Sequence, residues 1–169
     1  LLDSGHLHYG ENKVQEAEFK WANSRNVYKD IKLHMIGKLQ SNKAKKAVQI
    51  FDYIHSLDNE RLALKLHESE KLLNKKVKFF IQLNFGEENQ KSGILLEQTH
   101  EFYNYCVNDL SLNVIGLMCI PPISSNPIKY FTILKNHSRQ LNLKELSMGM
   151  SNDFESAVEE NSTFLRLGT

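Results

Sequence analysis

Short β-rich runs alternate with longer stretches of helical periodicity from one end of this chain to the other. The alternation restricts the fold, because consecutive parallel strands need a crossover connection that is usually a helix covering the sheet. It therefore predicts an α/β protein with a parallel sheet. The predicted strands are residues 7–9, 33–36, 53–55, 77–83, 114–118, 145–147 and 164–167. The predicted helices are residues 11–29, a helix beginning near Ser41, and residues 59–73, 95–110, 128–141 and 152–160.

This count of about seven strands and six helices leaves two architectures open, a closed (β/α)₈ barrel and an open doubly wound sheet. The first strand is not followed by a GxGxxG motif, and the chain has no Walker loop. This absence argues against the nucleotide-binding versions of the open sheet and therefore favours the barrel. The run at residues 77–83 is apolar at nearly every position, so we expect a strand that is buried on both faces.

Size and composition narrow the class of protein further. The chain has 169 residues, 41% hydrophobic and 24% charged, with 21 basic against 20 acidic side chains. We therefore expect one globular domain over residues 1–169, and neither a disordered chain nor a nucleic-acid binder that depends on phosphate neutralisation. No apolar run approaches the ~18 residues of a membrane helix. Two cysteines without a CxxC pair favour a reduced, cytoplasmic location.

Polar and glycine-rich segments follow several of the predicted strands, where a parallel barrel carries its functional residues. The segment 147–153 is the best phosphate candidate, because it joins a short strand to a helix whose N-cap we expect at Ser151 or Asn152. Glu155 would complete a capping box with Asn152. Simple helix capping explains this segment equally well, but Gly168 and Thr169 at the end of the last strand favour a phosphate cup.

Arg166 lies between Leu165 and Leu167, so alternation points it to the opposite face of its strand. Two interpretations stay open, a salt-bridged or solvated surface residue and a buried arginine that holds a ring nitrogen or acidic group of a ligand. His34 and His55 are interpreted as hydrogen-bonded core residues.

The remaining candidates predict no chemistry. His6 and His8 have no further metal ligand at suitable spacing, so we expect no metal site. Cys119 has no base beside it in the sequence, and we assign no catalytic residue. The basic clusters are interpreted as solvated helix ends.

Five runs of the sequence together resemble the pyridoxal phosphate homeostasis protein family, in order and at the expected spacing. They are HYGENKVQE at residues 8–16, LHMIGKLQSNK at 33–43, GLMCIP at 116–121, LSMGMSND at 146–153 and RLGT at 166–169.

The resemblance implies a barrel similar to the amino-terminal domain of alanine racemase, which binds pyridoxal 5′-phosphate (PLP) at the carboxyl ends of its strands. Family members carry or buffer intracellular PLP, a form of vitamin B6, without robust catalytic turnover. A PLP-dependent amino-acid racemase and a phosphosugar-binding barrel enzyme are the alternatives. The implied cofactor-binding residues are Ser147, Gly149, Ser151, Gly168 and Thr169 around the phosphate and Arg166 at the pyridine nitrogen, with Asn12, His34, Asn84, Lys91 and Met118 near the pocket.

In the family, the lysine that forms a Schiff base with PLP lies on the first barrel strand, upstream of the Gly-Glu-Asn motif. That motif is Gly10, Glu11 and Asn12 here, so we expect the lysine and its strand to precede Leu1 and a few residues to follow Thr169. The resemblance thus implies a barrel that lacks its first strand and binds PLP weakly, through the phosphate and without a covalent bond. We expect a monomer or weak dimer, with no nucleic-acid or membrane partner.

Overall fold

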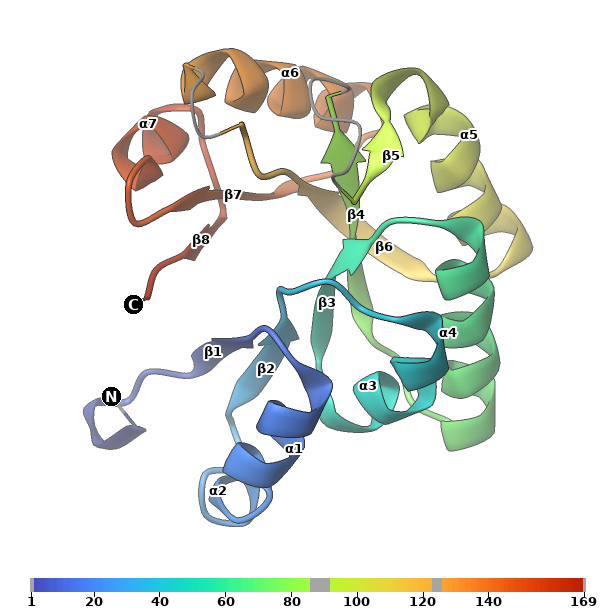
Figure 1. Cartoon of the computed structure of the whole chain (residues 1–169), viewed down its shortest axis with the longest axis vertical. Helices are drawn as coiled ribbons and strands as arrows, with labels where there is room; N and C mark the ends of the chain where they lie inside the picture. Colours follow the sequence, from blue (N-terminus) through green and yellow to red (C-terminus); the bar gives the residue numbers. More distant parts are fainter. Residues whose placement is uncertain (1, 86–91, 123–125, 169) are drawn as a thin grey trace.

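The computed structural model describes residues 2–85, 92–122 and 126–168. Its strands form one parallel sheet in the order β1-β2-β3-β4-β6-β7-β8, with β5 paired to β4, and the helices lie outside the sheet (Figure 1). The strands are β1 (His8–Glu11), β2 (Lys32–Met35), β3 (Tyr53–Leu57), β4 (Lys78–Asn84), β5 (Ile94–Leu95), β6 (Asn113–Met118), β7 (Glu145–Met150) and β8 (Phe164–Arg166). The main helices are α1 (Val14–Trp21), α2 (Ser24–Val27), α3 (Ala44–Ile50), α4 (Glu60–Leu73), α5 (Thr99–Asn104), α6 (Pro127–Gln140) and α7 (Phe154–Glu159). Short 3₁₀ turns cover Leu2–Ser4, Ser41–Lys43 and Leu96–Gln98.

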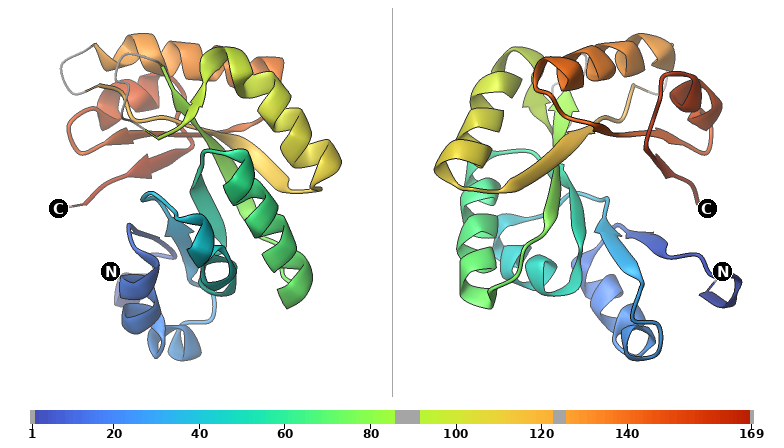
Figure 2. Two further views of the ribbon diagram at one scale, coloured as in Figure 1. Left: turned by 45° about the vertical axis from the view of Figure 1, so that its right-hand side comes forward. Right: turned by 180° about the vertical axis from the view of Figure 1, so that it is seen from behind.

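The sheet curls into a nearly closed barrel, which confirms the predicted (β/α)₈-type fold. Within the described residues, β1 pairs with β2 and β8 pairs with β7, and no hydrogen-bonded ladder joins β1 to β8. Both chain ends lie on this open side of the barrel (Figures 1 and 2). We call this side the seam.

Two layers of side chains stabilise the sheet. On the outer face, Ile54, Leu57, Phe79, Ile81 and Leu117 are completely buried in a hydrophobic core beneath the helices. Such burial contributes roughly 1.5–3 kcal/mol for each large side chain. The inner face, which we call the bore, is built from histidine and aromatic rings together with a few polar groups. The bore, rather than the outer core, therefore carries the candidate chemistry.

Glu11, the last residue of β1, anchors this edge strand to α1. Its buried carboxylate accepts a hydrogen bond from the Trp21 indole Nε1 at 2.7 Å and pairs with Lys20 Nζ at 2.8 Å. The Lys20 ammonium also lies 5.4 Å from the centre of the Trp21 ring. Edge strand β1 is thus held by side chains as well as by its ladder with β2.

Most predicted elements are confirmed, and the exceptions have local causes. The single helix expected over residues 11–29 is wrong, because it divides into α1 and α2 around Asn23 and Ser24, residue types that compete for backbone hydrogen bonds. The helix expected over residues 95–110 begins at Thr99 and continues as a π-helical turn, Tyr105–Asp109. Strand β5 has two residues, too few for periodicity to reveal. Among the described residues, no helix has the length and apolarity needed to cross a membrane.

Candidate functional site

Arg166 points into the bore from β8, so the structure decides between the two interpretations that the sequence left open. Its Nη1 donates to Ser147 Oγ at 2.7 Å, and its Nη2 donates to the backbone oxygen of Cys119 at 2.8 Å. Both acceptors are neutral, and no carboxylate of the described residues forms an ion pair with this guanidinium. Burial lowers the pKa of Arg166, with smaller opposing effects from Cys119 and Asp153. A desolvated cation without an anionic partner is suited to a ligand that accepts a hydrogen bond.

Ser147 connects Arg166 to a line of imidazoles across the bore. Ser147 Oγ lies 2.7 Å from His55 Nδ1, His55 Nε2 lies 2.9 Å from His34 Nδ1, and His34 Nε2 lies 2.9 Å from His8 Nδ1. We call His8, His34, His55 and Ser147 the imidazole chain. His34, His55 and Ser147 are buried, whereas His8 is exposed at the seam.

Burial keeps the inner imidazoles uncharged. It lowers the pKa of His34 to about 3, with a further contribution from His8, and it lowers the pKa of His55 well below its ordinary value, aided by His34 and Arg166. Burial also raises the pKa of the Cys119 thiol to about 12. At neutral pH the groups next to Arg166 are therefore hydrogen-bonding groups without charge.

Aromatic rings hold the imidazoles in place. Tyr53 stacks on His34 with ring centres 4.2 Å apart, and Phe80 stacks on His55 at the same distance. Phe164 of β8 meets both imidazoles, at 5.6 Å from His34 and 5.7 Å from His55. A cavity of about 330 Å³ opens beside these rings at the seam, between residues 6–10 and residues 164–167.

The two halves of the predicted phosphate cup meet at the carboxyl end of the barrel. Ser151 Oγ donates to the backbone oxygen of Gly168 at 3.0 Å. Gly149 turns the chain there with φ of +94°, and a Cβ at this position would approach the Ala157 Cβ to 2.6 Å. Thr169 lies outside the described residues.

The helix after this segment starts later than expected. Its N-cap is Asp153, so the expected cap at Ser151 or Asn152 and the capping box with Glu155 are wrong. The Asp153 carboxylate instead accepts a hydrogen bond from the Met150 backbone N at 2.6 Å. The Ser151 hydroxyl donates to the Gly168 carbonyl, and the Asp153 side chain makes no capping bond to an amide of α7.

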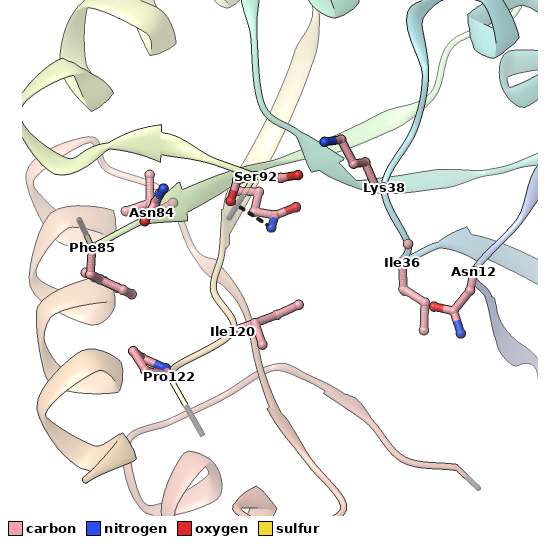
Figure 3. A pocket seen from close by; sticks show the side chains of 11 residues that line it. Asn12, Ile36, Lys38, Asn84, Phe85, Ser92, Ile120 and Pro122 are labelled. Atoms are coloured by element: carbon pink, nitrogen blue, oxygen red, sulfur yellow. Dashed lines mark hydrogen bonds between the residues drawn. The ribbon is translucent and has the colours of Figure 1, made fainter. Parts of the chain in front are cut away.

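Asn12 and Asn84 line opposite sides of a second cavity, of about 300 Å³, at the carboxyl ends of β1, β2 and β4 (Figure 3). Lys38 and Ser92 line the same cavity. Gly37 belongs to its rim, where a Cβ would come within 2.3 Å of the Asn12 backbone oxygen. This mouth cavity shares Ile36 with the seam cavity but is separate from the Arg166 contacts.

Met118 and Lys91 are the remaining predicted site residues. Met118 ends β6, is fully buried, and precedes Cys119, whose carbonyl contacts Arg166. Lys91 lies outside the described residues. Sequence reasoning assigned no site role to His8 or His55. One signal was available: His34, Tyr53 and His55 occupy inward positions of two adjacent strands, where histidines replace the usual apolar filling of a small barrel.

A parallel α/β barrel with polar groups along its bore and at the carboxyl ends of its strands defines a ligand-binding protein of the (β/α)₈ class. The family model for the N-terminal domain of alanine racemase matches residues 1–169. The "Pyridoxal phosphate homeostasis protein" of Aquifex aeolicus is 38% identical, over 95% of this chain and 74% of its own length. Its namesake from Escherichia coli K12 is 32% identical, over 99% of this chain and 76% of its own length. The chain belongs to the pyridoxal phosphate homeostasis protein family.

Solved structures agree with this assignment. PipY of Synechococcus elongatus PCC7942, solved with PLP bound, superposes with a TM-score of 0.86 at 34% identity, covering 99% of this chain and 82% of PipY. Lysine/ornithine decarboxylase of Vibrio vulnificus, with a TM-score of 0.71 at 14% identity, shares the fold alone.

Proposed function

We propose that this chain binds PLP and serves in intracellular PLP homeostasis rather than in substrate turnover. The observation that carries the proposal is the desolvated Arg166 guanidinium, whose two described acceptors are neutral, beside the junction of Ser151 and Gly168. An arginine fits an unprotonated ring nitrogen, and hydroxyl and backbone groups fit a phosphate. The structure of PipY with PLP bound supports the same ligand.

Different residues would contact different parts of PLP. Arg166 would donate to the pyridine nitrogen, and Ser147 Oγ accepts a hydrogen bond from the same guanidinium. Ser151, Gly149 and Gly168 would surround the phosphate. Ser147, which was also predicted there, bonds to Arg166 and His55 instead, and Thr169 lies outside the described residues. When bound, PLP supplies an aldehyde and an electron-withdrawing ring. Arg166 keeps the ring nitrogen unprotonated, which weakens that electron withdrawal and suits a carrier.

Storage rather than catalysis is supported by the uncharged surroundings of Arg166. The lowered pKa of His55 and the raised pKa of Cys119 leave neither an imidazolium acid nor a thiolate near Arg166 at neutral pH. We therefore propose that these residues hold PLP through hydrogen bonds and charge. The cytoplasmic location expected from the sequence stays a prediction.

PLP titration followed by isothermal calorimetry tests the proposal. We expect binding that Arg166→Met weakens at least about tenfold, because a charge-assisted hydrogen bond contributes roughly 1.5–3 kcal/mol. Arg139→Met, at an exposed position on α6, is the matched control and leaves the affinity unchanged.

Two competitors separate the alternatives. Pyridoxal without phosphate should bind more weakly than PLP, and glucose 6-phosphate should not displace PLP. Displacement by the sugar phosphate, together with no effect of Arg166→Met, would favour a phosphosugar site. Conversion of L-alanine to D-alanine in the presence of saturating PLP would contradict the storage role.

A further inference from the structure

The mouth cavity has a polar edge that the expected PLP contacts at Arg166 do not use. This polar edge consists of Lys38, which follows β2, Gln82 of β4, and Ser92, which precedes β5. Lys38 and Ser92 lie along the upper side of the cavity in Figure 3. Strands β2 and β4 are interior strands of the sheet, whereas the seam lies between β1 and β8. The polar edge therefore does not depend on how the barrel closes at the seam.

The backbone fixes Ser92 in its place beside the cavity. Gly93 has φ of +133°, and a Cβ at this position would come within 2.7 Å of the Asn84 backbone N. Glycine is the residue that allows such a close approach of two backbones. Strand β5 then continues the contact by pairing in parallel with the end of β4. The position of Ser92 is thus set by the sheet and is present before any ligand binds.

Hydrogen bonds orient the oxygen atoms of the polar edge. Gln82 Nε2 donates to the Ser92 backbone oxygen at 3.2 Å, so the other end of this amide is the acceptor Oε1. The Ser92 side chain also bonds to the carboxylate of Asp58, which accepts its hydroxyl proton and leaves the lone pairs of Ser92 Oγ as acceptors. Burial raises the pKa of this carboxyl group, and Asn59, Lys38 and Ser92 oppose the rise. The polar edge therefore combines the Lys38 ammonium with oxygen acceptors that suit a cation.

The opposite side of the cavity is an apolar wall, which consists of Phe85, Ile120 and Pro122 (Figure 3). The Phe85 ring lies 4.9 Å from the ring of Tyr130 on α6, which supports it from behind. Ile120 is 38% exposed, so its side chain has apolar surface that a ligand could cover. A volume of about 300 Å³ is at the lower end of the range for small-molecule pockets, roughly 300–1,000 Å³. The cavity is therefore suited to a small ligand with one apolar and one charged end.

We propose that the mouth cavity binds an amino acid with an aliphatic side chain, as a second ligand besides PLP. The Lys38 ammonium would pair with the carboxylate of the amino acid. The oxygens of Gln82 and Ser92 would accept hydrogen bonds from its ammonium group. Phe85 and Ile120 would cover its side chain. This assignment uses both charges of the ligand and its apolar part, and it involves no covalent step.

Isothermal calorimetry of the chain without PLP tests the proposal, with L-leucine as the probe. We expect saturable binding that is at least about tenfold tighter than that of L-alanine, because leucine buries more apolar surface. The acid 4-methylpentanoate lacks the amine of leucine, and 3-methylbutylamine lacks its carboxylate. Each should bind at least about fivefold more weakly than leucine. The absence of leucine binding would overturn the proposal, and so would binding of 4-methylpentanoate as tight as that of leucine.

Variants of the two sides of the cavity locate the site. Lys38→Met should weaken leucine binding at least about threefold, because the ion pair with the carboxylate is lost. Lys45→Met is the matched control, since Lys45 is also exposed but lies on α3 and does not line the mouth cavity. Ile120→Ser should reduce the preference for leucine over alanine. Equal affinities of Lys38→Met and Lys45→Met for leucine would overturn the proposal, and the ligand series with the wild type remains a test if a variant does not fold.

A competition experiment separates this site from the PLP site. Pyridoxine 5′-phosphate has the ring and the phosphate of PLP but no aldehyde, so it does not react with the amine of leucine. Leucine should bind with the same affinity in the presence and absence of this analogue at saturation. Displacement of leucine would mean that both ligands occupy one site and would overturn the proposal. A failure of PLP to bind would overturn the proposed function alone, because leucine binding is measured without PLP.

Discussion

His55 and Ser147 stand 92 positions apart in the sequence, yet a 2.7 Å hydrogen bond joins their side chains across the bore. The bond links β3 to β7, which are not neighbours in the sheet. Because Arg166 donates to the same hydroxyl, Ser147 couples the imidazoles to the group that we expect to contact PLP.

Ser147→Ala is expected to weaken PLP binding about tenfold, since Arg166 would keep one of its two described acceptors and lose its fixed direction. Calorimetric titration with PLP measures the effect. Ser138→Ala is the matched control, because Ser138 is also buried and donates to the Leu143 carbonyl at 2.9 Å, but on α6. Equal affinities of the two variants for PLP would contradict the role of Ser147.

Gly149→Ala is expected to destabilise the protein by roughly 1–3 kcal/mol, because the positive φ and the contact with Ala157 both oppose a side chain. Gly168→Ala introduces a methyl group where nothing lies within 4 Å, and its effect on stability should stay within about 0.5 kcal/mol. Urea unfolding followed by circular dichroism compares the two variants. If Gly149→Ala lost no more unfolding free energy than Gly168→Ala, the strain expected from a side chain at Gly149 would be contradicted.

The free energy of unfolding should fall as the pH is lowered from about 6.5 toward 3. The pKa of His34 is about 3 in the folded protein, whereas an unfolded histidine titrates near ~6.5, so the unfolded chain binds a proton that the folded chain excludes. The slope is about 1.4 kcal/mol per pH unit for His34, and the lowered pKa of His55 adds to it. Above pH ~6.5 this contribution is complete and constant.

Urea titrations at several pH values measure this slope. His34→Phe should make it shallower, whereas His100→Gln, at an exposed position on α5, should leave it unchanged. An identical slope in His34→Phe and the wild type would refute the assignment of a neutral, buried His34.

Glu70→Ala is expected to cost roughly 1–3 kcal/mol, because it leaves the buried backbone N–H of Val77 without its acceptor at 2.7 Å. Glu68→Ala on the same helix removes an exposed pair with Lys65, which is worth less than about 1 kcal/mol. Thermal unfolding by circular dichroism compares them, and equal losses would argue against a structural role for the Glu70 carboxylate.

Local rules account for the parts of the structure that were predicted from the sequence. Asn59 caps α4 where the apolar periodicity begins, by accepting a hydrogen bond from the Leu62 backbone N. The dense apolar run at residues 77–83 indicated a strand buried on both faces, and β4 is buried at five consecutive positions. Alternation predicted that Arg166 lies on the opposite face of its strand from Leu165 and Leu167, but it left open whether that face is the bore or the surface. The family motifs then supplied the rest of the expected site, which includes Ser151 and Gly168.

Such local rules could not predict the imidazole chain, because its contacts depend on how the sheet closes into a barrel. Strand periodicity indicates that His55 faces inward, but only the curvature of the barrel decides that Ser147 lies opposite it. The cap of α7 was mispredicted for a related reason. The Ser151 hydroxyl donates to the carbonyl of Gly168, 17 positions away after β8, a contact that local capping rules do not include.

The hydrogen bond between Trp21 and Glu11 makes tryptophan fluorescence a probe of strand β1. Trp21 is the single tryptophan of the chain, and its indole nitrogen is bonded to the last residue of edge strand β1. Detachment of β1 breaks that bond and exposes the ring to water, while the sheet from β2 to β8 contributes no indole signal. Tryptophan fluorescence therefore reports on the edge of the barrel at the seam, and circular dichroism reports on the barrel as a whole.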